Sequence, residues 1–483
     1  MIQIAEHSAE LVRRIRSSAV ENRQNALQGL LTEAQRWKPR GYDKEIALRR
    51  DFFENNQTAH MISELRRRYE LTYESMSPYT IPLFRHLCEQ QATVYNAAPK
   101  RDVLVSGRKD DDATSLASER YRASGVNVRL QTAEEIAAAA RLCFLRLNWS
   151  DVDDKVVITP FWPDAVAVVA NEADPTRLHS SLAIVAEVAG KFGLTHDERE
   201  KTYEIWGNTG EGWTWQQMRG DGSWVTHSEL ETPEMLPILP WVAVPFELPT
   251  TTLFALPPVD DVEVNKAQNV LMSDLLFTIS MQGFDHVTYT GDEPPKDWAM
   301  GPGRVLYGGL TGQFGTLSFN PSIEPVIKVG SELTETHLLL KGVSPSAATA
   351  DPKYMSALAQ SVANQPMLEH RSRRVPVMRE VEQDQLWPLM TWLDPELRNA
   401  GLTQARLEFN PGELAQTLDR ATEMSLSKQY VEAGISTWAR EMVRLGLAPD
   451  EQSASALIAT FAATNQSDEP DEPEPRAGDG QAD

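Results

Sequence analysis

The stretch DDVEVNKAQNVLMSDLLFTISMQG, residues 260–283, opens the part of the sequence that decides the fold. Its pattern predicts a helix, and the Gly- and Pro-rich residues 284–322 that follow contain only short strand-like runs. A second helical stretch covers 323–341, although residues 323–329 are also compatible with a strand and Gly330 with a break. The loop GVSPSAATAD (342–351) then leads to a longer helix over 352–392. Two helices therefore bracket a β insert and connect through small residues to a long helix.

The residues before this stretch divide into a helical part and a β-rich part. Helical patterns cover residues 5–37, 58–69, 82–96, 115–124 and 132–145. The alanine run at 137–140 predicts close packing. After Trp149, short β-branched and aromatic runs separated by turns predict an antiparallel meander. These runs are 155–159, 165–170, 181–188, 201–206, 213–218 and 223–228, and a further strand is expected at 241–244.

The residues after the long helix are expected to be helical. The turn at 410–412 should start a helix, and residues 429–445 and 450–462 should form a short helix–turn–helix. Residues 466–483 carry seven acidic residues against Arg476, which predicts a disordered acidic tail. Pro366, Pro376 and Pro388 predict kinks or breaks in the long helix. Helices and antiparallel strands segregated in this way indicate the α+β class.

Composition limits the classes of function. At 483 residues the chain has room for two to four domains. Its net charge of −23 argues against a basic face that grips nucleic acid, and −17 remains when the acidic tail is set aside. Cys88 and Cys143 stand in apolar contexts without a partner motif, which predicts neither a disulfide framework nor a zinc site. No apolar stretch approaches the roughly 20 residues of a membrane span.

Motifs for catalysis are missing from the sequence. It contains no nucleophile elbow, no phosphate-binding loop with Lys and Ser or Thr, no zinc-protease helix and no dinucleotide-binding glycine motif. The nine histidines are scattered and do not pair with a second ligand at helical spacing. We therefore predict no catalytic residue, no cofactor and no metal site.

The tryptophans of the predicted meander leave one enzymatic alternative open. Trp206, Trp213, Trp215 and Trp224 are typical of a core or of subunit contacts, but they could also stack against a sugar ring. In the second interpretation the chain is a carbohydrate-active hydrolase that uses two carboxylates near these tryptophans.

Three segments, together with the order of parts above, carry a resemblance to a known family. They are IPLFRHLC (81–88) leading to VYNAAP (94–99), PILPWVAVPF (237–246), and YVEAGISTWAREMVRLGLAPD (430–450). Over nearly its whole length the chain resembles the portal proteins, or head-to-tail connectors, of tailed bacteriophages. The resemblance implies a portal-like architecture with a wing at 1–256, helical over 1–149 and β-rich over 150–250. It further implies stem helices at 257–283 and 323–341, a small α/β clip at 284–322, a tunnel loop at 342–351, a long helix of the wing at 352–392 and a crown at 393–465.

The resemblance also implies a function without catalysis. Members of this family form rings, typically dodecamers, at one capsid vertex of the virion, after assembly in the host cytoplasm. The ring is a passive channel through which double-stranded DNA passes without sequence recognition during packaging and ejection. Its implied partners are the terminase motor, adaptor and tail proteins and the major capsid protein, with no membrane and no cofactor. Another virion component, such as an adaptor or a scaffold, is the remaining alternative.

The same resemblance assigns two sets of DNA-facing residues. The tunnel loop has small side chains suited to touching a duplex without reading bases, and lysines flank it. Its DNA-facing residues would be Lys341, Ser344, Pro345, Ser346, Thr349 and Lys353. An ordinary connection between helices is the alternative for this loop. The acidic lining of the channel, whose charge every further copy multiplies, would be Asp260, Asp261, Glu263 and Asp274.

Overall fold

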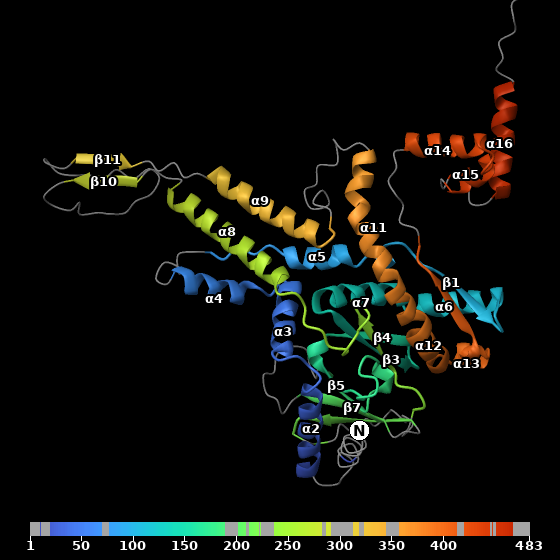
Figure 1. Ribbon diagram of the computed structural model, residues 1–483, viewed down its shortest axis with the longest axis horizontal. Helices are drawn as coiled ribbons and strands as arrows, with labels where there is room; N and C mark the ends of the chain where they lie inside the picture. Colours follow the sequence, from blue (N-terminus) through green and yellow to red (C-terminus); the bar gives the residue numbers. More distant parts are fainter. Residues whose placement is uncertain are drawn as a thin grey trace, which may run out of the picture. The chain divides into compact units, whose positions relative to one another are not determined.

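The computed structural model describes residues 20–69, 77–188, 201–208, 212–221, 236–282, 286–290, 313–317, 323–343, 357–412, 420–444 and 451–466, together with the single residues 10, 223 and 447. The chain divides into two compact units. The first contains Met1–Thr349 and Pro366–Leu414, and the second contains Ala350–Gln365 and Ala415–Asp483. Figure 1 labels the elements of both units.

From residue 20 onward, the described part of the first unit starts with four helices. They are α2 (Val20–Gln35), α3 (Tyr42–Phe53), α4 (Thr58–Tyr69) and α5 (Leu83–Gln91). The predicted helix at 58–69 is confirmed as α4, and the pattern at 82–96 is α5 followed by a 3₁₀ turn. Helix α3 was not predicted. Its buried residues Tyr42, Ile46, Arg49 and Phe52 recur every three or four positions, but the charge of Arg49 hides this face from a search for apolar periodicity.

Two further helices follow, of which α6 packs against strand β1 (Lys100–Val105) and α7 packs against strand β3 (Leu142–Ser150). Helix α6 (Asp111–Ala123) begins at the N-cap Asp110, whose carboxylate accepts a hydrogen bond from the Ala113 amide. Helix α7 (Val126–Ala140) follows after Gly125, which has a positive φ of 63°. The alanines at its C-terminal end are buried against strand β3, so the predicted close packing at 137–140 is confirmed.

A three-stranded antiparallel sheet forms the centre of the first unit. Its order is β4 (Lys155–Phe161), β3 (Leu142–Ser150) and β9 (Trp241–Pro245). Strand β3 corrects the helix predicted over 132–145, because the helix ends at Ala140 and Arg141 turns the chain with a φ of 67°. Leu142–Leu145 is buried throughout, and an uninterrupted apolar run of this length does not distinguish a buried strand from a buried helix.

The predicted meander is confirmed for the runs at 165–170, 181–188, 201–206 and 213–218, which form a four-stranded antiparallel sheet, whereas the run at 155–159 is strand β4 and belongs to the central sheet. The strands of the four-stranded sheet lie in sequence order, β5 (Val166–Val169), β6 (Ala183–Val188), β7 (Thr202–Asn208) and β8 (Trp213–Arg219). The register pairs Trp206 on the inner strand β7 with Trp215 on the edge strand β8. The run predicted at 223–228 lies outside the described residues except for residue 223.

A third sheet joins distant parts of the sequence. Strand β1 (Lys100–Val105) pairs with β2 (Arg108–Lys109) and with β12 (Arg406–Asn410), in register from Lys100↔Asn410 to Leu104↔Arg406. Asn410 ends this strand and residues 411–412 are not helical, so no helix starts within the turn at 410–412, and residues 413–419 that follow it lie outside the described part of the chain. Residues 393–412, expected to be helical, contain this strand and belong to the first unit.

The long helical segment after the loop changes helix type along its length. Helix α11 (Ala357–Glu380) contains Pro366 and Pro376, and a π-helical segment follows at Val381–Leu386. The chain then continues through α12 (Trp387–Leu393) and α13 (Pro395–Asn399). Side chains from residues 378–390 pack with α7, β3 and β9 in the largest apolar core cluster of the described residues. Short 3₁₀ turns occur at Val94–Asn96, Pro163–Ala165, Leu178–Ser180 and Leu402–Gln404.

The described residues of the second unit include, after the start of α11, the helices α14 (Arg420–Glu432), α15 (Trp438–Arg444) and α16 (Glu451–Gln466). The predicted helix–turn–helix is confirmed for α15 and α16, which pack together. The helix expected over 429–445 is interrupted, because Gly434 has a positive φ of 68° between α14 and α15. None of the described helices is both long and apolar enough to span a bilayer.

Residues 260–340, predicted to be two helices that bracket a β insert, fold as predicted where they are described. Helix α8 (Asp260–Gln282) is followed by the antiparallel pair β10 (His286–Thr290) and β11 (Gln313–Leu317), and then by helix α9 (Ile323–Leu340). The two helices pack against each other, and Figure 1 shows them side by side. The observed class is therefore α+β, with small antiparallel sheets and predominant helix.

Candidate functional site: the paired helices α8 and α9

Helices α8 and α9 form an antiparallel pair with one point of close approach. A Cβ atom placed on Gly330 of α9 would lie 2.8 Å from Leu271 Cδ2 of α8, which is nearer than Cβ contacts normally come. The end of α9 meets the start of α8, because His337 contacts Asp261. Residues 323–340 form one continuous helix, so the alternative of a strand or a break at Gly330 is wrong, and the glycine allows the two helices to approach.

A row of buried polar side chains fixes α8 to the segment before α5. Asn265, Asn269 and Ser273 stand four residues apart on one face of α8. Asn265 Oδ1 accepts a hydrogen bond from the Phe84 amide at 2.8 Å, and Asn269 Oδ1 accepts one from the Ile81 amide at 2.8 Å. Ser273 Oγ accepts a hydrogen bond from the Tyr79 amide at 2.9 Å. These side chains satisfy backbone donors that would otherwise be buried without partners, and they set the position of α8 along the segment.

Gln57, which precedes α4, contacts both the asparagines of this row and the segment that they bind. Its Oε1 accepts hydrogen bonds from Asn269 Nδ2 at 2.8 Å and from Asn265 Nδ2 at 3.4 Å, and its own amide group donates to the Ile81 carbonyl. Sequence reasoning missed this arrangement. The signal that could have revealed it is the spacing of small polar residues at i, i+4 and i+8 within a helix otherwise rich in apolar residues.

An ion-pair cluster anchors the start of α8. The buried guanidinium of Arg49, on α3, lies 3.0 Å from Glu45 Oε1 and 3.5 Å from Asp261 Oδ2. It also donates to the carbonyls of Ala139, at the end of α7, and of Pro258, just before α8. One buried arginine therefore joins three helices through backbone and carboxylate acceptors.

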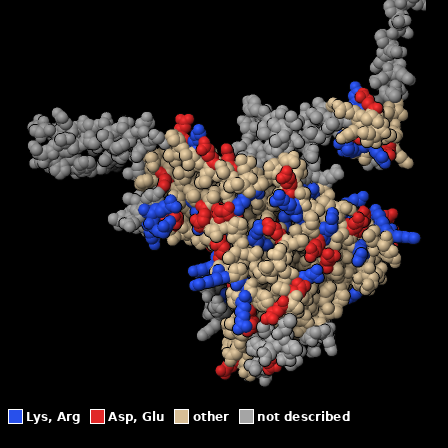
Figure 2. Space-filling model, in the orientation of Figure 1, with Lys and Arg blue, Asp and Glu red and all other residues tan. Residues whose placement is uncertain are grey.

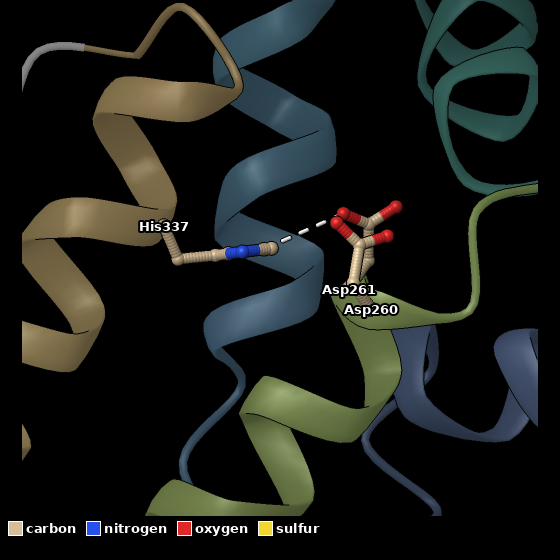
Figure 3. A group of neighbouring side chains, drawn as sticks. All are labelled: Asp260, Asp261 and His337. Atoms are coloured by element: carbon tan, nitrogen blue, oxygen red, sulfur yellow. Dashed lines mark ion pairs between the residues drawn. The ribbon is translucent and has the colours of Figure 1, made fainter.

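Lys341 and His337 complete the cluster from the C-terminal end of α9. Lys341 Nζ lies 2.8 Å from Asp261 Oδ1 and 3.0 Å from Asp260 Oδ2, and His337 Nε2 lies 3.4 Å from Asp261 Oδ1. Figure 3 shows the His337 ring directed toward the two carboxylates. Carboxylates at the first turn of α8 and a cation after the last turn of α9 also complement the two helix dipoles.

The electrostatics of the cluster favour charged forms. Burial opposes ionisation of Asp261, but its contacts with His337 and Lys341 and the nearby Arg49 outweigh burial and hold the pKa of this carboxyl below its usual value. Burial likewise opposes the charge of Lys341, while Asp261 and Asp260 raise the pKa of its ammonium group. The cluster is thus a network of ions at the junction of α8 and α9.

The structure changes the interpretation of the acidic lining. Asp261 is buried and balanced by cations, so it adds little negative charge to any surface. Asp260 and Glu263 remain more than half exposed, but each has a lysine near its carboxylate, Lys341 at 3.0 Å and Lys266 at 2.7 Å. Asp274 is half-buried. We therefore omit Asp261 from the proposed lining, and the other three residues stay a prediction.

The predicted loop residues fall mostly outside the described part of the chain. This applies to Ser344, Pro345, Ser346, Thr349 and Lys353. Lys341 is described, and its ammonium group is engaged by Asp260 and Asp261 with a side chain only 17% exposed. To contact a phosphate, Lys341 would first have to leave both carboxylates.

Helix α9 carries an apolar stripe that the single chain leaves in solvent. Val329, Leu333 and Leu340 are 61%, 40% and 79% exposed and recur at i, i+4 and i+11, which places them on one side of the helix. Leu276 and Ile279 near the end of α8 are also exposed. The face of α9 that packs inward contains Gly330, His337 and Leu338 instead. The pair is therefore bound to its own chain on one side and presents an apolar surface on another.

Charge on the described surface is mixed in sign. Figure 2 shows Lys and Arg side chains lying among Asp and Glu side chains over the first unit. Basic side chains gather at the end of α4, where Arg66, Arg67 and Arg68 are consecutive, and Glu64 pairs with two of them. This pattern does not resemble a continuous phosphate-binding face.

The tryptophans of the meander form core rather than a platform. Trp206 and Trp213 are buried in the cluster that also contains Trp241, and Trp206 stacks on Trp215 with ring centroids 5.5 Å apart. The buried carboxylate of Glu204 on β7 accepts hydrogen bonds from Arg146 and Gln217 at 2.7 Å each. This carboxylate faces a cation and an amide, which differs from the paired carboxylates of a glycoside hydrolase. Trp224 lies outside the described residues.

Comparison with known proteins finds similarity only among solved structures. No protein-family model and no curated protein matches the sequence. A chain of "Virion of native gene transfer agent (GTA) particle" is 14% identical with a TM-score of 0.44, over 85% of this chain and 94% of that chain. Chains of "Neck of native GTA particle computed with C12 symmetry" and "Neck of empty GTA particle computed with C6 symmetry" have the same coverage, with identities of 12% and 14% and TM-scores of 0.42 and 0.40. These TM-scores are too low to carry an argument.

Proposed function

We propose that this chain is the portal subunit of a tailed phage or a phage-like particle. Copies of the chain form a ring at one capsid vertex, and the ring is a passive channel for DNA packaging and ejection. The order of parts supports the proposal, because α8 and α9 bracket the β10–β11 pair and lead through residues 341–356 to the long helical segment that starts with α11. In this assignment α8 and α9 are the stem helices and residues 284–322 are the clip.

The exposed stripe on α9 is the observation that carries the proposal. Val329, Leu333 and Leu340 would cost free energy in water unless another surface covers them. The helix pair that bears them is fixed to its own chain by the buried row on α8 and the ion-pair cluster, so it presents the stripe in a defined direction. A rigid pair of helices with one apolar side is suited to packing against the same pair of a neighbouring copy in a ring.

The charge of the chain supports a channel that does not hold DNA. Each copy brings a net charge of −23, so a ring multiplies the negative charge that a duplex meets. The exposed carboxylates proposed to line the passage are Asp260 and Glu263, with Asp274 further along α8. The tunnel-loop residues Ser344, Pro345, Ser346, Thr349 and Lys353, with Lys341 at its start, are proposed to contact the passing duplex without reading its bases.

The partners follow from this placement of the ring. We propose that the clip docks the terminase motor during packaging and later the adaptor and tail proteins, while the wing contacts the major capsid protein. The protein then acts without a catalytic residue or a cofactor in the passage of DNA. Its location would be the portal vertex of the virion after assembly in the host cytoplasm.

Negative-stain imaging of the purified full chain tests the proposal. We expect rings with a central opening wide enough for duplex DNA. Particles that stay monomeric or dimeric across salt and protein concentrations would contradict the assignment. A second test deletes residues 344–349, which should leave the ring intact and impair packaging or retention of DNA in particles. Normal packaging by that deletion variant would remove the tunnel-loop assignment while leaving the ring in place.

A further inference from the structure

The ion-pair cluster at the junction of α8 and α9 contains the donor set of a metal site. Asp260 and Asp261 from α8 and His337 from α9 each offer a ligand atom, and these atoms all lie within 4.8 Å of one another. Two carboxylates and one imidazole form a mixed oxygen and nitrogen set, which suits divalent transition ions such as Zn²⁺, Co²⁺ or Mn²⁺ better than Mg²⁺. Figure 3 shows the imidazole and the carboxylates converging from different helices.

His337 is the second observation that points to a ligand. The residue is 6% exposed, and its Nε2 is buried without a hydrogen-bond partner among the described residues. Asp261 Oδ1 lies 3.4 Å from this nitrogen, which is longer than an ordinary N–H···O hydrogen bond and leaves the contact a weak ion pair. A buried ring nitrogen without a partner costs free energy, and coordination of an ion is one way to satisfy it.

The charges around the cluster are not balanced. Three carboxylates, those of Glu45, Asp260 and Asp261, surround two cations, Arg49 and Lys341, so the group carries one net negative charge when His337 is neutral. If a divalent ion replaces Lys341, the remaining charges sum to zero. Arg49 is held by backbone carbonyls and cannot leave easily, whereas Lys341 follows the last residue of α9 and keeps part of its side chain in solvent.

We propose that Asp260, Asp261 and His337 form a divalent transition-metal site in which Lys341 competes with the ion. In the metal-free chain the Lys341 ammonium lies between the two carboxylates. An ion that binds takes this position, adds His337 as a third ligand and displaces Lys341 toward solvent. Metal binding then links α8 to α9 directly and frees the lysine that precedes residues 342–351. The inference does not depend on the function proposed above.

Cobalt titration of the full chain tests the proposal, because Co²⁺ bound by nitrogen and oxygen ligands gives visible absorption bands. We expect the wild-type chain to bind Co²⁺ weakly after removal of metals with a chelator. Lys341→Met should bind about tenfold more tightly or better, since it removes the competing charge and keeps most of the apolar stem of the side chain. Lys341→Gln provides a second variant of this kind with a polar side chain.

The ligand variants complete the test. His337→Gln and Asp260→Asn, each combined with Lys341→Met, should lose the absorption bands and the rise in melting temperature that Co²⁺ causes in Lys341→Met alone. His60→Gln is the matched control, because His60 pairs with Asp51 at 2.8 Å outside the cluster. It should leave Co²⁺ binding unchanged. Failure of both Lys341 variants to bind Co²⁺, or binding that survives His337→Gln, would overturn the proposal.

Discussion

The central sheet and the α8/α9 pair differ in how completely they bury their apolar side chains. In β3, Leu142–Leu145 is buried completely between α7 and the neighbouring strands, and this region closes its core within one chain. The α8/α9 pair leaves Val329 at 61% and Leu340 at 79% exposure. The first region is closed by its own described residues, whereas the second leaves apolar side chains in solvent.

The same two regions differ in the interactions that hold them. The core around α7, β3 and α12 is held by apolar packing, with about 25 cal/mol of stabilisation for each Å² of apolar surface removed from water. Helix α8 is held to its own chain by Asn265, Asn269, Ser273 and the cluster around Asp261. Polar contacts depend strongly on geometry, so they can orient the helix pair for assembly while they add less stability.

The largest effect is expected in the core. Trp387 is 2% exposed, packs beside Tyr121 and donates a hydrogen bond from Nε1 to the Ala405 carbonyl at 2.8 Å. Trp387→Ala should lower the free energy of unfolding by about 3–5 kcal/mol, because it opens a cavity and leaves that carbonyl without its partner. Urea unfolding followed by circular dichroism measures this loss. Val152→Ala, at a position 95% exposed, should change stability by less than about 0.5 kcal/mol. Equal effects of the two changes would contradict the assignment of the core.

A smaller and more local effect is expected on α8. Asn269→Ala removes the acceptor of the buried Ile81 amide and the donor to Gln57, at a cost of about 2–3 kcal/mol. Hydrogen exchange should then accelerate in residues 79–84 and in α8, while β3 stays protected. Glu263→Gln, at an exposed position of the same helix, should leave exchange at these amides unchanged. Acceleration throughout the first unit would show that the buried row supports the whole fold rather than the position of α8.

A third effect depends on pH and comes from the part of α11 in the first unit. Burial, followed by the charges of Arg374 and Arg373, lowers the pKa of His370 to about 4 from an ordinary value of 6.5. Between these two values the unfolded chain binds a proton that the folded chain does not, so this contribution to stability is complete above pH 6.5 and is lost as the pH falls toward 4. His370→Phe keeps a ring beside Phe246 and removes the proton site.

The variant should therefore flatten the decline of stability between pH 6.5 and 4 by about 1–2 kcal/mol, a value reduced for partial exposure of the ring. Urea unfolding at several pH values provides the measurement. If the free energy of unfolding fell with pH as steeply in the variant as in the wild type, His370 would not be the source of this pH dependence.

The smallest effect on the single chain is expected at the stripe. Val329→Ser combined with Leu333→Ser should change the free energy of unfolding of the isolated subunit by less than about 1 kcal/mol per site, because 61% of Val329 and 40% of Leu333 are already exposed to solvent. Thermal melts under conditions that keep the chain monomeric test this. A large loss of stability would show that the stripe packs within its own chain.

Local patterns in the sequence predicted the elements that local forces determine. The limits of α4 agree with the predicted helix at 58–69, and the strands of the meander fall where β-branched runs and turns placed them. The pairing of β1 with β12 was not predictable, because it joins residues about three hundred positions apart and neither strand signals its partner. The start of β3 was assigned to a helix because its residues are apolar without interruption.

The candidate site was predictable only in part. The sequence placed Asp260 and Asp261 at the start of a helix, but it could not show that His337 and Lys341 return to the same point. That contact depends on the antiparallel packing of α8 and α9 and on the missing side chain at Gly330. Charges that appear unpaired along a sequence can therefore be paired with opposite charges in space, as Asp261 shows.

The mass of the assembled particle tests the central claim most directly. Mass photometry or sedimentation of the full chain should show a large closed oligomer, and Val329→Ser with Leu333→Ser should shift it to monomers without unfolding the subunit. Val152→Ser, which removes an exposed apolar side chain outside the helix pair, should assemble like the wild type. A stripe variant that still assembles into particles of the wild-type mass would contradict the claim that the α8/α9 pair forms the contact between subunits.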